Sequence, residues 1–143
     1  MTVKWTGLWP EVARSRVDRE RFARKGWIAC RHTGTWQPPI DVYENDSGIV
    51  VRVEAAGMRG EDFSISLAGH WLVIAGTRDD SSPKRVYHQM EIRFGEFRAE
   101  VYLPWPVEPE GAEASYEDGF LRIYLPRPTV QHVSVAEGGQ KED

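Results

Sequence analysis

The sequence predicts an all-β protein: an immunoglobulin-like antiparallel β-sandwich with a flexible N-terminal arm and a C-terminal tail. From Trp36 onward, apolar and polar residues alternate with a period of two. About seven such runs follow one another at short intervals, separated by turns rich in Gly, Pro, Asn and Asp. No helical spacing lies between them, so the strands have one another to pack against. The 143 residues, 41% hydrophobic and 28% charged, suit one domain.

Each run is a short strand with one apolar and one polar face, because alternate residues of a strand share a face. Asn45–Gly48 and Glu117–Gly119 are turns, and the short connection Ala68–His70 makes a hairpin of its flanking runs. The expected strands are 40–43, 49–55, 63–67, 71–75, 97–103, 112–116 and 121–125. The expected buried residues are Ile49, Val51, Val53, Phe63 or its neighbours, Val73, Phe97, Val101, Leu121, Ile123 and Leu125.

Residues 77–94 interrupt this pattern with a long polar connection. Val86–Met90 is a possible lone strand inside it. A connection of this length is uncommon in a small domain and is usually functional.

The arm, residues 1–35, differs from the rest of the chain in charge. It carries eight Lys or Arg and three acids, whereas the other 108 residues carry ten bases and nineteen acids. A four-residue apolar spacing predicts a short amphipathic helix from Pro10 to about Lys25. A basic arm can bind nucleic acid or the acidic body of its own oligomer. It lacks a dense Lys/Arg run, so no nucleic-acid partner is expected.

The sequence also predicts what the chain lacks in catalytic, metal-binding and membrane-spanning motifs. Cys30 is the single cysteine, and its neighbours Arg31 and His32 can lower its pKa, although an ordinary thiol is the preferred interpretation. The isolated histidines predict no metal site, and without a catalytic motif or phosphate loop the protein is expected to be a non-enzyme with no cofactor. No apolar run reaches the ~20 residues of a membrane helix, and no signal-peptide core is present, so a cytoplasmic protein with no membrane partner is expected. The four histidines are His32, His70, His88 and His132.

Three stretches together resemble the small heat-shock protein (α-crystallin) family. Trp36–Glu44 is similar to that family's domain-opening segment, and Ala114–Leu121 is similar to its A-x-x-x-(N/D)-G-x-L signature. Val133–Val135 resembles its I-x-I/V tail anchor. Tyr87–Glu91 with the following Phe94–Phe97 looks like the family's dimerisation loop and next strand. The resemblance covers about residues 36–135.

The resemblance implies an ATP-independent holdase that binds non-native client proteins and works as a homodimer-based oligomer. It divides the chain into an arm at 1–35, a sandwich at 36–127 and a C-terminal extension at 128–143. The implied dimer loop is Tyr87, His88, Gln89 and Met90. The arm residues that bind clients or support assembly are Trp5, Leu8, Trp9, Phe22 and Trp27.

The two apolar residues of the tail, Val133 and Val135, point the same way in an extended chain. They suit a groove between open sheet edges, as in peptide recognition by edge strands. The expected groove residues are Phe63, Ile65, Leu67, Ala112, Ala114 and Tyr116.

One position departs from the family pattern. Ala99 stands where the family commonly has an interface arginine, whose role is then absent or moved to Arg93 or Arg98.

Two other functions are compatible with the same sequence. One is a co-chaperone of the related sandwich type that binds a folded partner chaperone. The other is a carbohydrate-binding sandwich that uses Trp36, Trp71 and Trp105 as sugar platforms.

Overall fold

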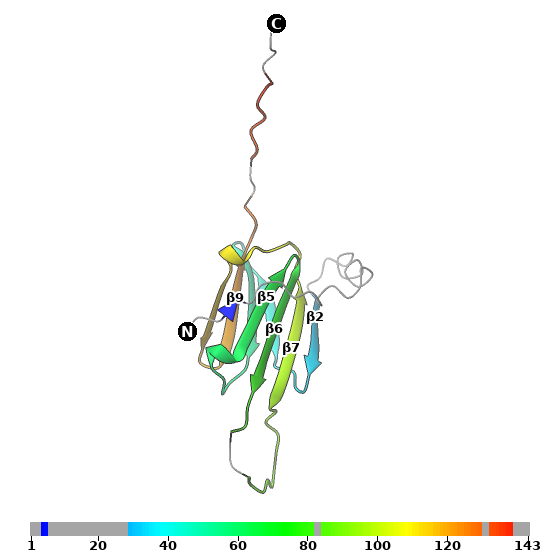
Figure 1. Cartoon of the computed structure of the whole chain (residues 1–143), viewed down its shortest axis with the longest axis vertical. Coiled ribbons are helices and arrows are strands. Elements are labelled where there is room, and N and C mark those ends of the chain that lie inside the picture. Colours follow the sequence, from blue (N-terminus) through cyan, green and yellow to red (C-terminus); the bar gives the residue numbers. More distant parts are fainter. Residues whose placement is uncertain (1–3, 6–28, 82–83, 130–131, 139–143) are drawn as a thin grey trace.

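In a computed structural model, which describes residues 4–5, 29–81, 84–129 and 132–138, two sheets pack face to face (Figure 1). The first sheet has the strand order β1-β5-β6-β7-β2 and the second has the order β3-β4-β9-β8. The strands are β1 Lys4–Trp5, β2 Ala29–Gly34, β3 Ile40–Glu44, β4 Gly48–Glu54, β5 Phe63–Ala68, β6 Trp71–Arg78, β7 Gly95–Tyr102, β8 Glu113–Glu117 and β9 Phe120–Pro126. Two 3-10 turns, η1 Gly60–Asp62 and η2 Pro109–Gly111, precede β5 and β8.

The predicted sandwich and its seven strands are confirmed, and the strand ends agree with the prediction to within three residues. The strand at Ala29–Gly34 was not predicted; it pairs antiparallel with β7 along six residues. The lone strand considered at Val86–Met90 is not formed in this single chain. The arm helix predicted from Pro10 lies outside the described residues.

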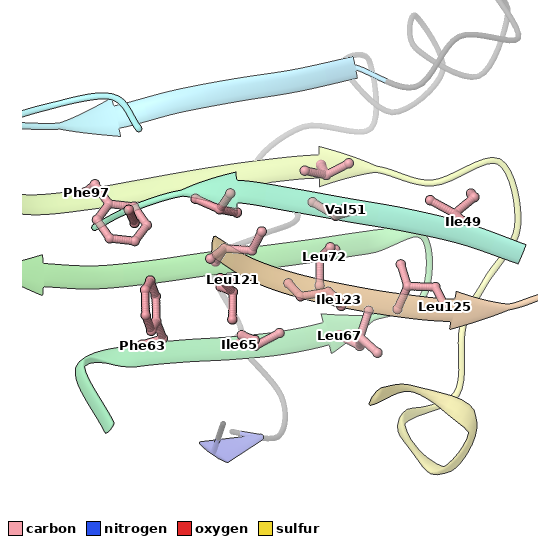
Figure 2. Packing of buried hydrophobic residues seen from close by; sticks show 14 of the residues in the cluster. Ile49, Val51, Phe63, Ile65, Leu67, Leu72, Phe97, Leu121, Ile123 and Leu125 are labelled. Carbon is pink, nitrogen blue, oxygen red and sulfur yellow. The ribbon is translucent and has the colours of Figure 1, made fainter. Parts of the chain in front are cut away.

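The hydrophobic core lies between the two sheets (Figure 2). Ile49, Ile65 and Ile123 are fully buried there, and all three come from different strands. Nine of the ten residues expected to be buried belong to this core. Val73 is the exception: it is buried, but on the other side of β6, in a separate cluster with Trp71 and Tyr102. The core neighbours on that strand are Leu72 and Ile74 instead.

The hairpin of β8 and β9 turns at Asp118 and Gly119. Both residues have a positive φ, 53° and 81°, which is the requirement of a type I′ turn. A side chain at Gly119 would place a Cβ 3.2 Å from the Cβ of Ala56, so the position is crowded as well as left-handed. The Asp-Gly pair of the family-like signature is therefore a structural requirement of this hairpin.

Candidate interaction surfaces

The connection between β6 and β7 projects beyond the ends of both strands (Figure 1). Its described apolar side chains are largely exposed: Val86 is 86% exposed, Met90 64% and Ile92 65%. Tyr87 donates a hydrogen bond to Asp80 Oδ2 at 2.8 Å, and this bond raises the pKa of the Tyr87 hydroxyl. The predicted dimer-loop residues thus lie on one exposed segment, which we call the loop (residues 79–94).

Arg78, at the end of β6, joins the loop to the sandwich. Its guanidinium carbon lies 3.9 Å from the Trp36 ring centroid, a cation–π contact, and its Nε donates to the carbonyl of Arg93 at 2.9 Å. Its Nη1 donates to the carbonyl of Ala56 at 3.2 Å. These groups line a cavity of about 580 Å³ at the base of the loop. Sequence reasoning missed Arg78, since no local pattern links it to Trp36.

Strand β3 forms one edge of the four-stranded sheet. Within the described chain it pairs along one side, with β4, through five residue pairs. Its other backbone edge therefore has the geometry to accept another strand.

The predicted groove residues come from β5, from β8 and from Ala112 just before β8, and the two strands meet at one side of the sandwich. The ring centroids of Phe63 and Tyr116 are 5.1 Å apart. Phe63, Ile65 and Leu67 are 3%, 0% and 7% exposed, so in this single chain they belong to the core. Ala112, Ala114 and Tyr116 are half-buried against the same core.

Strand β1 occupies the neighbouring edge of β5. Lys4 pairs with Ser64 and Trp5 with Ile65 in parallel register. A second segment that pairs with this edge of β5 has to replace β1.

The tail extends away from the sandwich (Figure 1). Val133 is 86% exposed and Val135 is 92% exposed. They are not brought to the groove of their own chain. Of the predicted arm residues, only the backbone of Trp5 is described, in β1; the others, Leu8, Trp9, Phe22 and Trp27, lie outside the described residues.

The position of Ala99 is fully buried, between Ile74 and His32 on the adjacent strands. Arg98 points to the opposite face, where its Nε lies 3.2 Å from Glu100 Oε1. Arg93 is exposed and contributes its carbonyl to the Arg78 contact. Neither arginine reaches the buried position of Ala99.

The tryptophans considered as sugar platforms are not open surfaces. Trp36 is 6% exposed and its Nε1 donates to the carbonyl of Gly95 at 2.8 Å, and Trp71 is 9% exposed. Trp105 is half-buried, with the Arg127 guanidinium 5.2 Å from its ring centroid.

The structure also bears on the predictions about the thiol, metal binding and membrane-spanning segments. Burial of its sulfur raises the pKa of the Cys30 thiol, although the residue is exposed as a whole, so the pKa is not lowered by Arg31 or His32. In the residues that the structure covers, no cluster of three metal-ligating side chains occurs. None of the helices found in those residues is long and apolar enough to cross a membrane.

Known proteins share this arrangement. A family model described as the Hsp20/alpha crystallin family matches residues 41–136. Small heat shock protein C2 of Rickettsia felis is 32% identical over 92 residues, which are 63% of this chain and 60% of that protein. Small heat shock protein C4 of the same organism is 30% identical over 92 residues, 63% of this chain and 56% of that protein. The chain thus spans less than two thirds of the length of these curated relatives.

Solved structures agree on the fold. Heat shock protein 16.0 from Schizosaccharomyces pombe is 26% identical and has a TM-score of 0.59, over 71% of this chain and 99% of that chain. A small heat-shock protein from Xylella fastidiosa is 24% identical with a TM-score of 0.66, over 74% of this chain and 99% of that chain.

Proposed function

Because the chain belongs to the Hsp20/alpha crystallin family, which supports a chaperone role, we propose that it is an ATP-independent holdase that works as a dimer-based oligomer. A holdase binds partly unfolded proteins and lowers their free concentration by mass action, which slows aggregation. The proposed parts are the arm at 1–35, the sandwich at 36–127 and the extension at 128–143.

One observation carries the assembly part of this proposal: among the described residues, the most exposed large apolar side chains lie outside the sandwich. Val86, Met90 and Ile92 project from the loop, and Val133 and Val135 from the tail. Exposed apolar groups of this kind mark contacts with other molecules. The sandwich closes its own core, so these side chains are left for a partner subunit.

For the dimer, we propose that Tyr87, His88, Gln89 and Met90 pair with the open edge of β3 in a neighbouring subunit. An edge strand offers a row of unpaired backbone groups to such a segment. Arg78 then acts as a positioning residue, because its contacts to Trp36 and Arg93 set the direction in which the loop leaves the sandwich.

For the larger oligomer, we propose that Val133 and Val135 enter the groove between β5 and β8 of another subunit. The groove side chains are buried in the single chain, so the tail has to displace β1 and loosen the contact of Phe63 with Tyr116. This cost makes assembly reversible.

Size-exclusion chromatography with light scattering tests the assembly. The wild-type chain is expected to run as a large oligomer, and Val133→Ala with Val135→Ala shifts it toward dimers. Each valine contributes about 1.5 kcal/mol by burial, repeated in every tail. Ser134→Ala is the matched control, because residue 134 points the opposite way in an extended tail and is expected to keep the oligomer size. A monomeric wild type contradicts the proposal.

A client aggregation assay tests the holdase activity. A heated model client is expected to scatter less light with the full chain than alone, with or without ATP. Removal of residues 1–28 keeps β2 and is expected to reduce protection, since it removes Trp5, Leu8, Trp9, Phe22 and Trp27. Undiminished protection by the shortened chain places the client surface on the sandwich, and no protection by either form rejects the holdase.

A further inference from the structure

The outer face of the five-stranded sheet, directed away from the core, is buried at its centre. The strand register places Ser66, Val73 and Glu100 in one row across β5, β6 and β7, and Trp71 beside Tyr102 in the next row. Val73 is 2% exposed, Ser66 4%, Glu100 6%, and Trp71 and Tyr102 each 9%. An outer face of a two-layer sandwich is normally in water, so this burial needs a cover.

Neighbours within the sheet supply only part of that cover: Trp71 and Tyr102 pack beside Val73, and each of them is itself only 9% exposed. In the row of Val73 the adjacent side chains are Ser66, which is small, and Glu100, which is held by Arg31 and Arg98. The four-stranded sheet packs on the opposite face of β6, against Leu72 and Ile74. Within the part of the chain that the structure describes, the strands form these two sheets and no third.

The topology requires one segment of the chain to travel from edge to edge of this sheet. β1 pairs with β5 at one edge, and β2 pairs with β7 at the other. The residues between them are 6–28. The two edges are about 19 Å apart, four strand spacings. Twenty-three residues reach about 75 Å when extended, so the segment has length to spare. The core side is filled by the second sheet, so of the two faces of this sheet only the outer one is open to a crossing segment.

The composition of residues 6–28 suits this face. The segment contains apolar side chains that match an apolar centre of Trp71, Val73 and Tyr102. Its large apolar residues are Leu8, Trp9, Val12, Val17, Phe22, Trp27 and Ile28.

We propose that the outer face of the five-stranded sheet, centred on Val73, is the docking surface for residues 6–28 of the same chain. One consequence rests on the proposed function: because the same arm side chains bind clients, docking and client binding compete for them. Release of the arm then exposes two apolar surfaces at once, the arm itself and the Val73 face.

Limited trypsin digestion tests the docking, because residues 6–28 contain six cleavage sites at Arg14, Arg16, Arg19, Arg21, Arg24 and Lys25. In the wild-type chain these sites are expected to be cut much more slowly than Lys84 in the exposed loop. Val73→Glu places a charge opposite Glu100 and is expected to speed cleavage of the segment about tenfold. A tenfold change corresponds to losing the docking free energy of one buried valine side chain.

The matched control is Val50→Glu, the same change at a 7% exposed valine on the outer face of the other sheet. It is expected to leave the cleavage of residues 6–28 unchanged. Val73→Thr keeps the side-chain shape and serves if Val73→Glu does not fold; it is expected to speed cleavage about threefold, as a hydroxyl in an apolar contact weakens docking. Circular dichroism verifies that each variant is folded.

Three outcomes overturn the proposal. Wild-type cleavage within residues 6–28 as fast as at Lys84 shows that the segment is not docked. Equal acceleration by Val50→Glu shows general destabilisation. Protection that disappears on dilution to monomers shows that a second copy covers the face. The client aggregation assay is read separately, so docking without client protection rejects the proposed function alone.

Discussion

The two outer faces of this sandwich have the same strand geometry and opposite environments. On the four-stranded sheet, Arg122 and Ser115 are exposed, and Val50 is shielded from the sides by Tyr43 and Tyr124. On the five-stranded sheet, Val73 is flanked in its own row by Ser66 and Glu100 and packs beside Trp71 and Tyr102, and all five side chains are buried. The difference teaches that alternation decides which residues share a face, whereas what lies over that face depends on the rest of the chain.

The charged groups of the two faces differ in the same way. Asp41 and Arg52 form a 2.6 Å pair that is open to water. Glu100 is buried and is held by Arg31 and Arg98. A carboxylate removed from water needs such partners, while an exposed pair contributes little.

The largest loss of unfolding free energy is expected for a residue of the main core, and this loss is the upper limit against which substitutions on the outer faces are compared. Leu72→Ala removes a side chain that is fully buried in the core, next to Val73 in the sequence but on the opposite face. The free energy of unfolding is expected to fall by about 2–5 kcal/mol. Denaturant unfolding measures it, and a loss no larger than that of Val73→Ala contradicts the assignment of Leu72 to the core.

Glu100→Ala is expected to have the next largest effect, about 1.5–3 kcal/mol, because two charge-assisted hydrogen bonds are lost from a buried position. The comparison is with Asp41→Ala on the other outer face, which is expected to leave the unfolding midpoint unchanged. Equal losses from the two substitutions would break the contrast between the faces.

Val73→Ala removes two methyl groups from the covered face and is expected to cost about 1.5 kcal/mol. In a chain shortened by residues 1–28 the same substitution is expected to cost about 0.5 kcal/mol or less, since the proposed docking segment is removed. This double-mutant cycle is measured by denaturant unfolding. An unchanged cost in the shortened chain rules out residues 1–28 as the cover.

The smallest change in unfolding free energy is expected on the exposed outer face of the four-stranded sheet. Arg122→Ala is expected to change the free energy of unfolding by at most about 0.5 kcal/mol, because the side chain is exposed and no buried partner depends on it. Thermal unfolding detects a larger change, which would indicate a cover on this face as well.

The strands and turns were predictable because their signals are local. The period of two placed Ile49, Val51 and Val53 on one face, and the Asp118–Gly119 pair supplied the positive φ of a hairpin turn. The prediction that Val73 is buried was confirmed, but the residue lies on the other side of β6 from the main core. The sequence contains the reason: Trp71–Ala75 is apolar on both faces, which is typical of a strand buried on both sides.

The candidate surfaces were less predictable than the strands. The exposed loop and tail follow from polar composition and the absence of alternation, but the contact of Arg78 with Trp36 joins residues 42 positions apart. The sequence predicted that the groove residues of β5 and β8 lie side by side. Their burial in the single chain was not predictable, because it depends on how closely the two strands approach each other.

The sequence by itself determined the fold class, the order of the strands and the two faces of each, because alternation and turn chemistry act between residues close in the chain. The tertiary structure decided that Ala29–Gly34 is an edge strand on β7, that β1 lies beside β5, and that Val73 is buried on the outer face of its sheet. The physical reason is that a strand satisfies its backbone hydrogen bonds with residues far away in the sequence. Any edge of suitable length can supply those partners, so only the assembled sheet shows which one does.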